Sequence, residues 1–186
     1  FQAEDGIRDF CLSRGLGDVY KRQVIDRALL SLKSNDFPIY YLSPRGVKLD
    51  AQISNSISKL DGMTLVCGKY EGVDERVIKH YNMIEISIGD YILSGGDLAA
   101  MVLIDSVVRC LPNVLGNPLT LNEESFTNHL LEYPLYTQPR EWKNYKVPDV
   151  LLSGDHKKIK NWKIKQSEDI TMKRRPDLWK KYLKLK

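Results

Sequence analysis

The strongest constraint on the fold is a glycine-rich stretch, residues 87–97 (SIGDYILSGGD), which joins a short apolar run to a longer one at 98–111. Gly89, Gly95 and Gly96 let the main chain turn through positive φ or approach another group closely. The pattern fits two interpretations equally well. One is a tight turn from a strand into a helix, and the other is a loop whose backbone binds a flat, partly polar ligand.

Strand patterns and helix patterns alternate before this stretch. Apolar side chains recur at helical spacing in residues 24–33, 51–60 and 73–78, and short apolar runs typical of buried strands occupy 37–42, 63–67 and 83–88. Turn-forming residues follow two of the runs, at 43–46 and 68–72. The alternation predicts an α/β fold with a parallel sheet covered by helices. Folds of this class bind ligands beyond the carboxyl ends of their strands.

The chain divides into four predicted segments. Residues 1–23 lack periodicity and resemble a translated sequencing-adaptor tail, so we expect a non-native leader that packs poorly. Residues 24–112 form the α/β domain, and 113–124, with Gly, Pro and Asn, form a linker. Residues 125–186 form a small, mainly helical domain, with helices expected at 125–132, 156–166 and 176–185.

Composition excludes several classes of protein. No apolar run is long enough to span a bilayer, and no signal-peptide pattern occurs, which predicts a cytoplasmic protein without membrane partners. Cys11, Cys67 and Cys110 are widely spaced and fit neither a disulfide framework nor a metal-binding pair. The three histidines also lack ligand spacing, so the residues predict no metal site.

Positive charge is concentrated at the C-terminal end. Residues 157–186 contain twelve Lys or Arg against three Asp or Glu, a net charge of +9, whereas the other residues sum to −5. This asymmetry predicts a surface that faces a polyanion, the alternative being a solvated helical tail. The residues predicted to contact RNA are Lys157, Lys158, Lys173, Arg174 and Arg175.

Five blocks, in order and with compatible spacing, resemble the signature blocks of the bacterial tRNA (guanine-N1)-methyltransferases, the TrmD-type SPOUT enzymes. They read YLSPRG, CGKYEGVDERV, SIGDYILSGGDLAAMVLIDSVVR, EESF…LLEYPLYTQP and VPDVLLSGDH, and the match runs from about Val24 to the C-terminus. The resemblance implies a deep trefoil knot in the α/β domain and a homodimer with its site at the subunit interface. It implies methyl transfer from S-adenosylmethionine to N1 of guanosine 37 in the tRNA anticodon loop, with Mg2+ as an assisting ion.

The resemblance further implies that three loops, at 41–46, 68–74 and 87–97, bind S-adenosylmethionine. The cofactor-binding residues carried over from the motifs are Tyr41, Leu42, Ser43, Pro44, Gly68, Tyr70, Glu71, Gly72, Ser87, Ile88, Gly89, Tyr91, Leu93, Gly95 and Gly96.

The resemblance implies two catalytic residues, Glu124 and Arg109. N1 of guanine carries a proton that a carboxylate can remove, and the negative charge that then gathers on O6 is stabilised by a guanidinium. The family has aspartate where this chain has Glu124, and the neighbouring Glu123 is a competing base. From spacing alone, Arg109 is also the i, i+4 ion-pair partner expected for Asp105.

One departure bears on activity. The family's first strand and an early glycine-rich block have no counterpart before residue 24, which predicts a truncated fragment of low activity. The competing function is a non-catalytic RNA-binding module with inactive cofactor loops. A SPOUT enzyme that acts on rRNA is disfavoured by the blocks at 133–139 and 147–156.

Overall fold

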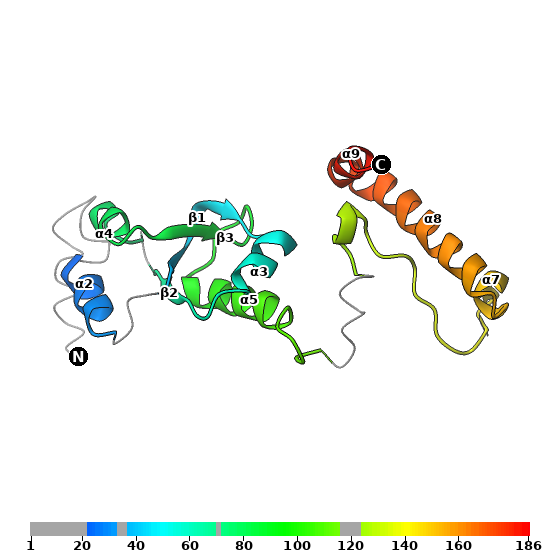
Figure 1. Ribbon diagram of the computed structural model, residues 1–186, viewed down its shortest axis with the longest axis horizontal. Helices are drawn as coiled ribbons and strands as arrows, with labels where there is room; N and C mark the ends of the chain where they lie inside the picture. Colours follow the sequence, from blue (N-terminus) through cyan, green and yellow to red (C-terminus); the bar gives the residue numbers. More distant parts are fainter. Residues whose placement is uncertain (1–21, 33–36, 70–71, 116–123) are drawn as a thin grey trace. The chain divides into compact units, whose positions relative to one another are not determined.

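The computed structural model describes residues 22–32, 37–69, 72–115 and 124–186 (Figure 1). The chain divides into two compact units, Phe1–Val114 and Leu115–Lys186, and each is described by itself. The predicted leader lies almost wholly outside the described residues, so it stays a prediction. Within the described ranges, no helix combines the length and the apolar character needed to cross a membrane.

The first unit contains a three-stranded parallel sheet in the order β2-β1-β3. The central strand β1 spans Ile39–Lys48 and pairs with β2 (Thr64–Cys67) on one side and β3 (Ile84–Ser87) on the other. All three strands lie where apolar runs predicted them. The α/β class and the parallel sheet are therefore confirmed.

Helices cover both faces of this sheet. Helices α3 (Ala51–Ile57) and α5 (Gly96–Val108) lie on one face, and α2 (Arg22–Leu30) and α4 (Glu75–His80) on the other (Figure 1). Successive side chains of a strand point to opposite faces. Accordingly, Tyr40, Leu42, Ile57, Ile86 and Leu103 share one buried cluster, and Leu29, Tyr41, Val66, Val77 and Met83 share another.

The turn predicted at residues 43–46 lies inside β1 as a bulge. Leu42 and Val47 both pair with Ile86, so the four residues between them leave the ladder. Gly46 lies directly on the β3 backbone, where an added Cβ would sit 2.4 Å from the carbonyl carbon of Glu85. The turn-forming residues therefore redirect the strand rather than end it.

The second unit is mainly helical. Its elements are η2 (Thr127–His129), β4 (Glu141–Trp142), β5 (Tyr145–Lys146), α7 (Asp149–Leu152), α8 (His156–Arg174) and α9 (Pro176–Leu183). Helix α8 runs eight residues beyond its predicted end. Its buried Thr171 accepts a 2.8 Å hydrogen bond from the Leu131 amide and donates one to the Ser167 carbonyl, which holds the preceding segment against the helix.

The helix predicted at 125–132 is wrong. Only the short 3-10 turn η2 forms there, because Phe126 and Asn128 adopt left-handed backbone conformations, with φ of 78° and 51°. Ser125 caps no helix: its hydroxyl accepts a 3.0 Å hydrogen bond from the Glu132 amide. A serine side chain that can bond locally to the backbone competes with the helical ladder in this way.

Candidate cofactor pocket and catalytic residues

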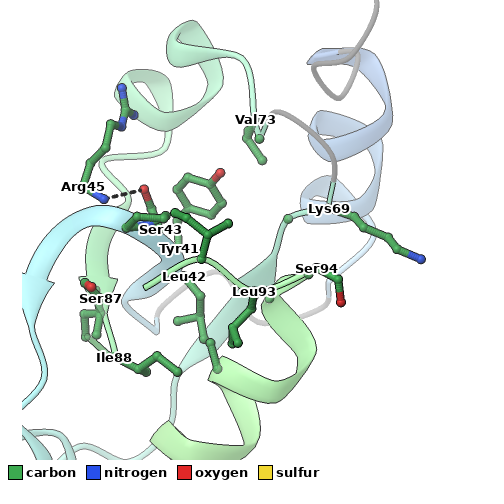
Figure 2. Close-up of a pocket in the computed structure, with 18 of the residues that line it drawn as sticks. Tyr41, Leu42, Ser43, Arg45, Lys69, Val73, Ser87, Ile88, Leu93 and Ser94 are labelled. Atoms are coloured by element: carbon green, nitrogen blue, oxygen red, sulfur yellow. Dashed lines mark hydrogen bonds between the residues drawn. The ribbon is translucent and has the colours of Figure 1, made fainter. Parts of the chain in front are cut away.

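The β1 bulge and the loops that follow β2 and β3 surround one cavity of about 970 Å³ (Figure 2). Every described residue of the predicted cofactor set lines it. These residues are Tyr41, Leu42, Ser43, Pro44, Gly68, Gly72, Ser87, Ile88, Gly89, Tyr91, Leu93, Gly95 and Gly96. Tyr70 and Glu71 lie outside the described residues. Three motifs that are separate in the sequence therefore meet at one edge of the sheet.

Two of the loops touch through glycine backbone. The Gly96 amide donates a 2.7 Å hydrogen bond to the Gly68 carbonyl, and Lys69 and Gly95 form an isolated antiparallel bridge. A Cβ on Gly96 would lie 3.0 Å from the Cα of Cys67, so this contact requires glycine. Gly89 has φ of +155°, whereas Gly95 is extended and has room for a side chain.

Tyr41 forms the floor of the cavity. It is 5% exposed, and burial raises the pKa of its hydroxyl, which keeps the group neutral. Two glycines lie against its ring: a Cβ on Gly68 would sit 3.2 Å from the hydroxyl oxygen, and one on Gly72 would sit 2.9 Å from it. Gly72 also has φ of +105°. Because Gly68 and Gly72 lack a side chain, their backbone can pack directly against the Tyr41 ring.

The β1 bulge supplies the neighbouring wall. The Arg45 amide donates a 3.2 Å hydrogen bond to the Ser43 hydroxyl, drawn as a dashed line in Figure 2. The Arg45 guanidinium donates 3.0 Å hydrogen bonds to Glu75 on α4 and Glu85 on β3. Both hydrogen bonds raise the pKa of Arg45. Arg45 thus links the bulge to α4 and to β3 through hydrogen bonds.

The rim of the cavity is more charged than the predicted set implied. Asp74 caps α4 and accepts hydrogen bonds from the side chain and amide of Arg76, which lower its pKa to about 2. Lys69, Arg22 and Gln23 also line the cavity, although the last two were assigned to the leader. The start of α2 at Arg22 is the structural signal that places them there.

These surroundings fit S-adenosylmethionine. Apolar side chains of Leu42, Ile88 and Leu93 offer surface to a flat base, and the glycine loops leave backbone close to the cavity. The charged rim suits a ligand with an ammonium and a carboxylate at one end. A cavity with apolar walls and a few polar groups is the usual form of a small-molecule site.

Arg109 lies at the C-terminus of α5 and lines a second cavity of about 770 Å³. This cavity shares Ile88, Tyr91 and Leu93 with the first one. The glycine-rich stretch at 87–97, which carries these three residues, therefore lies between Arg109 and the first cavity. Glu124 belongs to the second unit and Arg109 to the first. Glu123 lies outside the described residues.

Known proteins resemble this chain over most of its length. Residues 3–181 match the family model described as tRNA (Guanine-1)-methyltransferase TrmD. The chain belongs to this family. The resemblance drawn from the five sequence blocks is confirmed, and the matched range also includes most of the predicted leader.

Three relatives, each called tRNA (guanine-N(1)-)-methyltransferase, illustrate the match. The Pelagibacter ubique protein is 53% identical over 170 residues, which cover 91% of this chain and 75% of the relative. The Rhodospirillum rubrum protein is 50% identical over 169 residues, with 91% and 71% covered. The Ruegeria pomeroyi protein is 47% identical over 171 residues, with 90% and 70% covered.

The cations predicted to contact RNA fall into two groups at opposite ends of α8. Lys157 and Lys158 lie in its first turn, where their amides donate to Asp155, and Lys173 and Arg174 lie in its last turn. A helix of this length separates the two groups by roughly 25 Å. Arg175 donates hydrogen bonds to Asp177 at the start of α9, and this carboxylate partly neutralises the charge of Arg175.

The family resemblance also implied Mg2+, for which the structure provides no argument. Among the described residues, no group of three or more His, Cys, Asp or Glu is placed to hold a metal ion.

Proposed function

We propose that this TrmD-family chain transfers a methyl group from S-adenosylmethionine to N1 of guanosine 37 in the anticodon loop of tRNA. The observation that carries the proposal is the convergence of three family motifs on one cavity. The names of the relatives support tRNA guanine N1 as the acceptor. The site of action is the cytoplasm, where tRNA is modified.

The cofactor supplies an electrophilic methyl group on a sulfonium centre. The chain's own residues would hold and orient it: Leu42, Ile88 and Leu93 line the cavity and would offer apolar surface to the flat base, and the backbone of the glycine loops would supply hydrogen-bonding groups. Tyr41, which stays neutral, closes the cavity floor and excludes water. Fixing the donor in this way converts an encounter of two reactants into a transfer within one complex.

Glu124 and Arg109 act on the acceptor. The Glu124 carboxylate takes the N1 proton, so that the N1 lone pair is available to the methyl group, and the Arg109 guanidinium stabilises the negative charge that develops on O6. The position of Arg109 supports this role, because its cavity shares a wall with the cofactor pocket. Glu123 is the alternative base.

The active form is a homodimer, and the first unit carries the deep trefoil knot of its family. Helix α5 supports the dimer, because its outer side leaves Leu98, Met101 and Val102 exposed at 58%, 65% and 47%. Contiguous apolar surface of this kind marks a protein interface. A second copy of the chain covers this surface of α5. Sedimentation of the purified chain measures its oligomeric state, and a Met101→Glu variant that dimerises as strongly as the parent chain would exclude α5 from the interface.

The decisive experiment measures methyl transfer from labelled S-adenosylmethionine to a tRNA transcript with guanosine at position 37, against a transcript with adenosine there. Glu124→Gln is expected to lower kcat by about 10²–10⁴-fold and Arg109→Gln by about 10²–10³-fold, with cofactor binding retained. Glu123→Gln is the matched control, and a larger loss there would make Glu123 the base.

Calorimetry with the cofactor separates the outcomes. Cofactor binding without any transfer to the guanosine transcript would overturn the proposal in favour of a non-catalytic RNA-binding module. Robust turnover by the purified chain would refute the expectation that it is poorly active.

A further inference from the structure

A small hairpin in the second unit has no role in the fold described above. Strands β4 and β5 pair antiparallel, with Glu141 opposite Lys146 and Trp142 opposite Tyr145. Lys143 and Asn144 connect them, both with positive φ (49° and 67°), the requirement of a two-residue type I′ turn. The Val147 amide donates a 2.9 Å hydrogen bond to the Arg140 carbonyl and closes the base of the hairpin.

The two aromatic residues of this hairpin face solvent. Directly opposed residues of an antiparallel pair project from the same face, so Trp142 and Tyr145 lie side by side on one surface. Trp142 is 60% exposed and Tyr145 is 76% exposed. An isolated two-stranded hairpin is marginally stable. Its rings are therefore available to a partner rather than committed to a core.

A cation lies against this aromatic face. The Lys143 ammonium lies 4.8 Å from the centre of the Trp142 ring, whereas Lys146, opposite Glu141, projects from the other face of the hairpin. Glu141 is the one acidic residue of the hairpin, and its carboxylate lies 3.7 Å from the Lys146 ammonium. Exposed rings interleaved with cations are the arrangement that binds unpaired nucleotides, because bases stack on the rings and phosphates pair with the cations.

We propose that the hairpin at residues 141–146 binds unpaired nucleotides of the substrate RNA by stacking bases on Trp142 and Tyr145. The proposal rests on the proposed function for its RNA substrate and adds a contact outside the cofactor pocket. The net positive charge of the hairpin favours a nucleic acid over an apolar protein surface. A paired stem cannot offer the faces of its bases, so the hairpin selects loops or single strands.

The test uses the full chain and a fluorescein-labelled RNA stem-loop with an unpaired loop, with an RNA duplex of equal length for comparison. Trp142→Ala and Tyr145→Ala are each expected to weaken stem-loop binding by at least about fivefold, the lower limit for losing one stacked base. Duplex binding is expected to change little. Leu135→Ala is the matched control, because Leu135 is 71% exposed in the preceding segment but has no ring.

Trp142→Phe keeps an aromatic surface and is expected to retain stem-loop binding. RNA that stacks on Trp142 quenches its fluorescence, so this variant is expected to show a smaller decrease in tryptophan fluorescence when RNA is added. Stem-loop affinity unchanged in both alanine variants would overturn the proposal, as would equal losses for stem-loop and duplex. A change of oligomeric state in those variants, with RNA affinity retained, would make the hairpin a protein interface instead. If methyl transfer fails while stem-loop binding depends on the rings, the proposed function is wrong and the stacking contact stands.

Discussion

Replacing Gly46 with alanine tests whether the β1 bulge depends on direct backbone contact with β3. The new Cβ would lie 2.4 Å from the carbonyl carbon of Glu85 and from the amide nitrogen of Ile86. Carbon atoms in ordinary contact are about 3.5–4.0 Å apart, so the strands must separate locally by about 1 Å or more. Overpacking costs typically 1–3 kcal/mol. Because the obstacle is strand backbone and not a flexible side chain, we expect about 3 kcal/mol for Gly46→Ala.

Urea denaturation followed by far-UV circular dichroism measures the loss, and Gly95→Ala is the matched control. Gly95 is extended, with φ of −174°, and its Cβ would lie 3.5 Å from Lys69, an ordinary contact. Alanine replaces glycine there at the start of α5, where we expect a loss below about 1 kcal/mol. All three tryptophans lie in the second unit, so their fluorescence midpoint should not move. Equal stability of the two variants would refute the steric argument.

Two further predictions concern single side chains. Thr171→Val removes the acceptor of the 2.8 Å hydrogen bond from the Leu131 amide, which should destabilise the second unit by about 1–3 kcal/mol in urea denaturation followed by tryptophan fluorescence; an unchanged midpoint would contradict this. Asp74 has a pKa lowered to about 2, chiefly by the Arg76 side chain, so its contribution to stability is fully present above the unfolded-state pKa of about 4 and is lost as the pH falls through about 2. In the Asp74→Asn variant, the far-UV circular dichroism should change less with pH between about 4 and about 2 than in the parent chain. An unchanged pH dependence in this range would contradict a stabilising role for the Asp74–Arg76 ion pair.

The sequence predicted that the ends of the strands lie at one edge of the sheet, for a physical reason. Strand and helix patterns alternate at residues 24–111, and parallel strands place their carboxyl ends at one edge of a sheet. The order of the elements predicted only this edge as the place where a ligand would bind. The family resemblance named the three motifs around Tyr41, Gly68 and Gly89, and they line one cavity.

Features that depend on pairing partners escaped prediction. The residues Ser-Pro-Arg-Gly at 43–46 are typical of a turn, and only the shared pairing of Leu42 and Val47 with Ile86 makes them a bulge. The hairpin at 141–146 was missed because Lys143 and Asn144 lack the glycine that usually marks a type I′ turn. The flanking aromatics Trp142 and Tyr145, with two residues between them, were the available signal.

The glycines of the site illustrate the limit of composition as evidence. Gly89, Gly95 and Gly96 were treated alike, yet Gly89 requires its positive φ and Gly96 requires its contact with the Cys67 backbone. Gly95 requires neither. Glycine permits positive φ and close approach of another backbone. The neighbouring segments of the fold determine whether a given glycine position needs either. The contrast between Gly46→Ala and Gly95→Ala follows from the neighbouring backbone, because glycine itself is common to both positions.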